Sequence, residues 1–255
     1  MRVTLNGIVA ADEDVWVYEW FGYKAFGPQT IRDAIANNPA GEELVLEINS
    51  PGGSVMAGSE IYSVLRSAEG VQSRAEILSM AASAASYLCL GCNTVMISPV
   101  AQMMIHLPAT STQGDRVDHQ RSLQMLDSTR EAILNAYELK AGEKGDRAEF
   151  RRMMNAETWL TAQEALDHGL VDGILYQEEG PAPQNLMNAA GAGIRALGSS
   201  SGMPDIVQLR AEYAKAHQNP PADPIEPENP TGGAPENHNQ IQQATARLAL
   251  EKIRF

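Results

Sequence analysis

Short runs of apolar residues alternate with amphipathic stretches over the first 178 residues of the chain. The short runs are rich in valine, leucine and isoleucine, as is typical of β-strands, whereas the longer stretches repeat apolar residues at helical spacing. Strands that alternate with helices predict an α/β domain with a largely parallel sheet. The expected strands are Val3–Val9, Leu44–Asn49, Arg74–Leu78, Thr94–Ile97, Met103–Ile105 and Val171–Leu175, and the expected helices are Thr30–Asn37, Ser54–Arg66, Ser83–Leu90, Val117–Ala141, Ala148–Asn155 and Ala162–His168.

The longest expected helix, Val117–Ala141, has an apolar stripe and a charged face. Such a stripe must be covered by the rest of the domain or by another subunit. Its apolar members are Leu123, Leu126, Ile133, Leu134 and Tyr137, and its charged face carries Arg121, Asp127, Arg130 and Glu131.

The amino-acid composition changes after residue 178. Residues 179–236 are rich in glycine, serine and proline, and such a segment buries too little apolar surface to offset the entropy lost on ordering it. We therefore expect a folded domain over 1–178, a flexible linker over 179–236 with one helical island at Asp205–His217, and a short C-terminal helix over 237–255. The tail as a whole is expected to be largely disordered and to act as a tether.

Composition narrows the possible partners. The 255 residues carry a formal net charge of −13 with a pI near 4.8, and an acidic surface repels phosphate backbones and anionic lipid. No run of 18 apolar residues occurs, and the first residues lack the apolar core of a signal peptide. We expect a cytoplasmic protein that binds neither nucleic acid nor membrane.

Neither a metal nor a cofactor is expected. The two cysteines, Cys89 and Cys92, form a single CxxC, which lacks the second pair of ligands that a structural zinc needs. They lie late in an apolar helical stretch rather than at a helix start, where a redox thiolate would be activated. We interpret them as reduced core residues.

Three short segments carry candidate chemistry, and each also has an ordinary structural explanation. The strand at 44–48 runs into Pro51-Gly52-Gly53, a turn that either exposes backbone amides for an oxyanion or simply reverses the chain. Ser79, Ser83 and Ser86 lie around a strand-to-helix junction, where a serine is either a nucleophile or a cap. His106 ends an apolar strand, as either a base or a buried histidine.

Taken together, these segments resemble the proteolytic subunit of Clp proteases, a family with a crotonase-like fold. The resemblance extends over residues 1–178 and rests on the order and spacing of three motifs. Residues 48–53 read INSPGG, residues 81–83 read AAS and residues 104–106 read MIH. Segments 158–162 and 169–172 resemble the closing part of the family domain. The resemblance implies an α/β domain built as a spiral of ββα units.

The roles of four residues follow from this resemblance. Ser83 would attack the peptide carbonyl, and His106 would take its proton and return it to the leaving amine. The backbone amides of Gly53 and Ala84 would form the oxyanion hole.

The third member of the triad departs from the family pattern. The family has aspartate where this chain has Glu157, and a glutamate can also orient an imidazole although its extra methylene changes the geometry. Asp172 is the competing acid, and we favour a structural role for it because it lies in the family's Gly-Leu-Val-Asp turn. The interval from Ser83 to His106 is about two residues shorter than usual in the family.

The resemblance also implies a function and partners. Cellular members form heptameric rings, often stacked, and receive polypeptide substrates from a Clp ATPase. The start close to the first strand and the extension beyond residue 178 are more like the head maturation proteases of phages and prophages, which trim capsid and scaffold proteins. We therefore expect a self-assembled endopeptidase of that kind. A housekeeping subunit fed by an ATPase, a crotonase-type acyl-CoA enzyme and an inactive ring-forming scaffold remain as alternatives.

Overall fold

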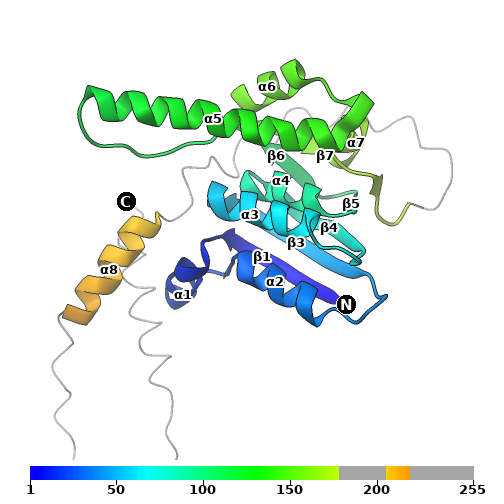
Figure 1. Ribbon diagram of the computed structural model, residues 1–255, viewed down its shortest axis with the longest axis horizontal. Helices are drawn as coiled ribbons and strands as arrows, with labels where there is room; N and C mark the ends of the chain where they lie inside the picture. The colour runs from blue at the N-terminus through cyan, green and yellow to red at the C-terminus, as the bar shows by residue number, and fades with distance from the viewer. Residues whose placement is uncertain (178–204, 219–255) are drawn as a thin grey trace, which may run out of the picture.

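A computed structural model describes residues 1–177 and 205–218 of the chain. Its helices and strands alternate along the sequence and form one sheet with helices packed against it (Figure 1). The strands are β1 Arg2–Val9, β2 Ala25–Phe26, β3 Leu44–Gly53, β4 Ser73–Ala82, β5 Thr94–Ile97, β6 Gln102–Ile105, β7 Thr158–Thr161 and β8 Gly173–Ile174. The α-helices are α1 Asp12–Trp20, α2 Pro28–Asn37, α3 Val55–Arg66, α4 Ala84–Leu88, α5 Arg116–Ala141, α6 Arg147–Asn155, α7 Ala162–Asp167 and α8 Ile206–Gln218, and the 3-10 helices are η1 Cys89–Gly91 and η2 Gly142–Lys144.

The sheet is parallel except for its last pairing. Its main order is β2-β1-β3-β4-β5-β8, while β6 pairs with the end of β4 and then antiparallel with β7. The α/β class and the parallel sheet predicted from the sequence are confirmed. Strand β4 pairs with β5 over residues 74–77 and with β6 over residues 80–82. The second pairing places the carboxyl end of β4 beside β6, and this positions the site described below.

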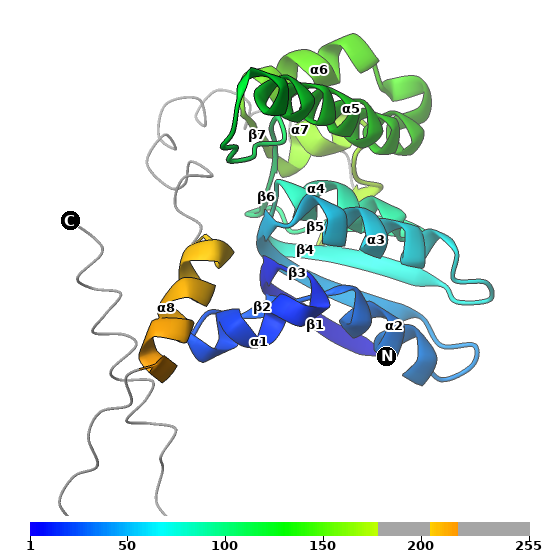
Figure 2. The same ribbon diagram turned by 60° about the vertical axis from the view of Figure 1, so that its left-hand side comes forward.

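Helices α2, α3 and α4 lie along one face of the sheet, and α5, α6 and α7 form a further group beyond α4 (Figures 1 and 2). Between these layers lies the main hydrophobic core, which is aliphatic with a few aromatic rings. Leu134 and Tyr137 of α5 are buried in it, whereas the N-terminal half of the same helix exposes Val117, Leu123 and Met125.

Among the strands and α-helices, three were not predicted from the sequence: α1, β2 and β7. The segment of α1 contains Val15, Trp16, Val17 and Tyr18, a β-branched and aromatic run whose local preference is for a strand. Packing overrides this preference, since Val17 and Tyr18 are buried in a cluster that also contains Ile8 and Ala10 of the β1 segment and Leu209 of α8. Strands β2 and β7 have two and four residues, too short for a reliable periodic pattern.

Helix α8 occupies the place of the helical island expected at Asp205–His217, and it packs against α1 (Figure 2). Leu209 is buried between the two helices, and the Tyr213 ring stands edge-on to both Trp16 and Trp20. Arg210 pairs with Asp14 at their border. The expected linker and terminal helix, apart from α8, lie outside the described residues.

We expect Leu209→Ala to weaken the docking of α8, since truncating a buried leucine costs about 2–5 kcal/mol and the helix has few other buried contacts. Val207→Ala is the matched control because Val207 is 70% exposed. The intrinsic fluorescence of Trp16 and Trp20, followed through thermal unfolding in a Trp159→Phe background so that only these two tryptophans contribute, reports the docking. Equal behaviour of the two variants would contradict the observed packing.

Candidate active site

Ser83 lies at the turn between β4 and α4. Its φ of +54° and ψ of −124° fall in a region that side-chain-bearing residues rarely adopt. A strained backbone of this kind persists only where its surroundings fix it, and such residues concentrate at functional sites. The side chain is half-buried at the carboxyl edge of the sheet, where the turn presents the hydroxyl.

His106 reaches this serine because β6 runs beside the end of β4. Ala82 pairs with Met104, and the Ser83 amide donates to the Met104 carbonyl at 2.9 Å. His106 follows two residues later, and its Nε2 lies 2.7 Å from Ser83 Oγ. The structure therefore brings together the two residues that the sequence nominated as nucleophile and base.

The environment of His106 favours its neutral form. Burial lowers the pKa of the imidazole below its ordinary value, and the nearby Glu157 carboxylate partly opposes this shift. A neutral imidazole can accept a proton from the serine hydroxyl, whereas an imidazolium cannot.

Glu157 lies next to His106 through the β6–β7 pairing. Ile105 pairs with Thr158 in the antiparallel register, so the next position on each strand places Glu157 opposite His106. The glutamate is exposed, has a φ of +49°, and makes no hydrogen bond to the imidazole in the described part of the chain. The carboxylate thus acts on His106 through its charge in this structure.

Asp172, the competing acid, is engaged elsewhere. Its Oδ2 accepts from the Val95 amide at 2.6 Å and from Lys140 Nζ at 2.5 Å. These contacts join the chain just before β8 to β5 and α5. The carboxylate has a structural role in this arrangement.

Two amides of the glycine turn at the end of β3 are engaged in hydrogen bonds. The Gly52 amide donates to Ser50 Oγ at 3.1 Å, and the Ser54 amide donates to the Val9 carbonyl at 2.7 Å. The bond from the Ser54 amide to the Val9 carbonyl is part of the parallel pairing of Val9 with Gly53, and it does not involve the Gly53 amide. The Gly53 amide, which the sequence nominated for the oxyanion hole, takes part in neither bond.

The other amide nominated for the oxyanion hole belongs to Ala84. As the first residue of α4 it has no acceptor within its own helix. Gly52 packs directly against this point, since a Cβ on Gly52 would lie 2.6 Å from Ser83 Cβ and 2.9 Å from the Ala84 nitrogen. The glycine turn and the serine turn are thus in contact.

Gly52→Ala is expected to abolish most activity, because its φ of +94° is strained for alanine and the new methyl group would displace the Ser83 turn. Gly41→Ala is the matched control: its φ is +82°, but nothing lies within 4 Å of its Cβ position. We expect the control to lose about 1–2 kcal/mol of stability with unchanged kcat/KM. Both variants are measured at a temperature where thermal-shift curves show them folded. Equal losses of kcat/KM would contradict the contact between Gly52 and the Ser83 turn.

Two buried hydroxyl groups adjoin the site, on Ser86 and Tyr137. The sequence pattern indicated Ser86 as one of three serines near the strand-to-helix junction, and it placed Tyr137 in the apolar stripe of the long helix. Their contact across the fold is a tertiary feature that no local pattern signals.

No metal site accompanies these groups: among the described residues, no cluster of three or more histidine, cysteine or acidic side chains could hold an ion. Cys89 and Cys92 are buried free thiols, and burial raises the pKa of Cys92 to about 12. This agrees with their interpretation as reduced core residues. No helix in the described ranges is long and apolar enough to span a membrane.

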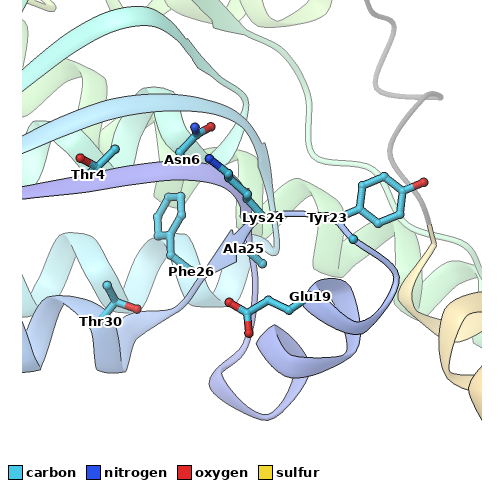
Figure 3. Close-up of a pocket in the computed structure, with 9 residues that line it drawn as sticks. Thr4, Asn6, Glu19, Tyr23, Lys24, Ala25, Phe26 and Thr30 are labelled. Carbon is cyan, nitrogen blue, oxygen red and sulfur yellow. The ribbon is translucent and has the colours of Figure 1, made fainter. Parts of the chain in front are cut away.

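A separate pocket of about 490 Å³ lies between α1 and the β1–β2 edge (Figure 3). Asn6, Glu19, Tyr23, Lys24 and Thr30 are among its lining residues. It contains none of the residues nominated for catalysis.

Comparison with known proteins gives the same family. The model of the family described as Clp protease matches residues 34–178. The chain is 32% identical over 143 residues to the ATP-dependent Clp protease proteolytic subunit 1 of Chlamydia abortus, covering 54% of this chain and 72% of that protein. It is 30% identical over 199 residues to the corresponding subunit 1 of Frankia casuarinae, covering 71% of this chain and 92% of that protein.

The matched region contains the glycine turn, the Ser83 turn, His106 and Glu157, whereas α1 and α8 lie outside it. With more than half of its length matched and a serine and histidine in hydrogen-bonding contact within the match, the chain belongs to the Clp protease family and is a serine peptidase.

Proposed function

We propose that the chain is an endopeptidase that cleaves polypeptides through an acyl-enzyme formed on Ser83. The observation that carries this proposal is the 2.7 Å contact between Ser83 Oγ and His106 Nε2 on a turn packed against Gly52. This contact satisfies the geometric requirement for a nucleophile and its base.

The proposed reaction uses this geometry in two steps. His106 Nε2 takes the Ser83 proton as Oγ bonds to the scissile carbonyl carbon, and the amides of Gly53 and Ala84 stabilise the oxyanion. The imidazolium then gives the proton to the leaving amine. Water repeats the sequence on the acyl-enzyme, and Glu157 stabilises the imidazolium in both steps.

We further propose that the protein works as a head maturation protease on capsid and scaffold polypeptides. Its support is the extension beyond residue 178, the limit of the family match, which contributes α8, a helix docked on α1. A tail that is held at one point and continues beyond it suits a protease that must be retained in a shell.

The competing proposal is a housekeeping subunit that depends on a Clp ATPase, as the names of the relatives indicate for those proteins. A crotonase-type acyl-CoA enzyme does not need the Ser83–His106 contact, so this alternative is disfavoured. An inactive scaffold is favoured only by the glutamate at position 157.

We also propose a homo-oligomer, either a heptameric ring or stacked rings. Its support is the N-terminal half of α5, where Val117, Leu123 and Met125 are 48%, 62% and 46% exposed. Exposed apolar side chains gathered on one segment mark interaction surfaces in soluble proteins. Leu123 belongs to the apolar stripe for which we expected cover by the rest of the domain or by another subunit.

The test is cleavage of a scaffold or capsid protein encoded beside this gene, with and without a Clp ATPase and ATP. We expect cleavage by the full chain alone, and none by Ser83→Ala. Cleavage only in the presence of the ATPase and ATP would favour the housekeeping function instead. If the chain cleaved unfolded casein efficiently but left the scaffold protein intact, the peptidase activity would stand and the maturation role would be excluded.

A further inference from the structure

A chain of buried hydrogen bonds connects α5 to the nucleophile turn. Ser86 Oγ donates to the Ser83 carbonyl at 2.6 Å, and Tyr137 OH lies 2.7 Å from the same Ser86 Oγ. Ser86 is 0% exposed and Tyr137 is 1% exposed. The two hydroxyl groups come from elements far apart in sequence, α4 and α5, which pass one another above the sheet (Figure 1).

The direction of this chain follows from its chemistry. A hydroxyl has one proton to donate, and that of Ser86 is used by the Ser83 carbonyl. Tyr137 must then donate to Ser86. Burial raises the pKa of the Tyr137 phenol, so the donor keeps its proton at ordinary pH. The order is therefore tyrosine to serine to carbonyl.

The accepting carbonyl belongs to the peptide that joins Ser83 to Ala84. In a trans peptide, the C=O and the N–H lie in one plane and point in opposite directions. Holding the Ser83 oxygen toward the interior therefore aims the Ala84 N–H outward. That N–H is the oxyanion donor of the proposed function.

The Ser83 carbonyl receives two donors, since the Ser86 amide also lies 2.9 Å from it. The Ser83 amide is held by Met104 at 2.9 Å. Of these groups, only the Ser86 hydroxyl makes a further hydrogen bond to another helix, through Tyr137 of α5. A residue with a φ of +54° needs such fixing, because its relaxed conformation would rotate the peptide.

We propose that Ser86 and Tyr137 are positioning residues that aim the Ala84 amide at the oxyanion. This inference rests on the proposed function. It predicts a loss in the transition state rather than in substrate binding, because the oxyanion exists only after attack. Neither side chain needs to touch the substrate.

The experiment measures kcat and KM for a fluorogenic peptide, the Ki of a peptide boronate, and Tm. Ser86→Ala is expected to lower kcat about 10- to 100-fold, less than the loss of an entire oxyanion donor, and to raise the boronate Ki similarly with little change in KM. Tyr137→Phe should cause a smaller loss of the same kind. The double variant should resemble Ser86→Ala, because both act through one chain.

Ser73→Ala is the matched control. Ser73 is also buried and hydrogen-bonded, to Asn93, but it lies at the opposite end of β4. It should lower Tm without altering kcat.

A kcat for Ser86→Ala within twofold of the parent, or a loss no larger than that of Ser73→Ala, would overturn the positioning role. If Ser86→Ala does not fold, Tyr137→Phe decides in the same way. A parent chain without Ser83-dependent turnover would instead overturn the proposed function itself.

Discussion

Ser83→Ala and His106→Ala are each expected to lower kcat on the order of 10⁶-fold, the size of loss found when a serine-peptidase nucleophile or base is removed. The double variant should be no worse than either single variant, because the two groups act as one unit. This follows from the 2.7 Å contact that makes each useful only through the other. Steady-state kinetics on a fluorogenic peptide measure all three.

Ser79→Ala is the control for this series, since Ser79 lies in the same small-residue segment but is exposed on β4. It should retain kcat within twofold. Additive losses from Ser83 and His106, or a comparable loss from Ser79, would show that the hydrogen-bonded pair is not the catalytic unit.

Glu157→Gln is expected to lower kcat at least 100-fold and up to about 10⁴-fold, the range expected when the acid of a triad is neutralised. It should also move the acidic limb of the kcat/KM profile to lower pH. The carboxylate raises the pKa of His106 against the lowering effect of burial, so removing its charge lowers this pKa further. The pH profile therefore tests the charge effect separately from the loss of rate.

Asp172→Asn is the matched control among the acids. It removes the partner of Lys140 and weakens the link from β8 to β5 and α5, so it should lower Tm. The kcat of the folded protein and its acidic limb should stay in place. A steep loss of kcat from Asp172→Asn, with Glu157→Gln unchanged, would show that the wrong carboxylate was chosen.

The strands, and the segments that carry the oxyanion turn, the nucleophile and the base, could be predicted because their sequence signals are local. An apolar strand ending in INSPGG, a small-residue turn around Ser83 and a strand ending at His106 each occupy a few consecutive residues. Parallel pairing then brings their carboxyl ends to one edge of the sheet. The contact between Ser83 and His106 is the geometry that these segments imply.

Other features depend on partners distant in sequence and could not be predicted in the same way. Helix α1 forms because Val17 and Tyr18 are buried in a cluster with Ile8 and Leu209, against the local β preference of that segment. The link from Tyr137 to Ser86 spans 51 residues, and neither position is unusual alone. Glu157 was nominated by resemblance, and its place opposite His106 depends on the short strand β7.

The most direct test of the account is to treat the full chain with a fluorophosphonate probe and to identify the modified residue by peptide mass spectrometry. We predict one phosphonylated residue, Ser83, with labelling abolished in Ser83→Ala and strongly slowed in His106→Ala. Labelling at another serine, or equal labelling in the Ser83→Ala variant, would contradict the assignment of the nucleophile.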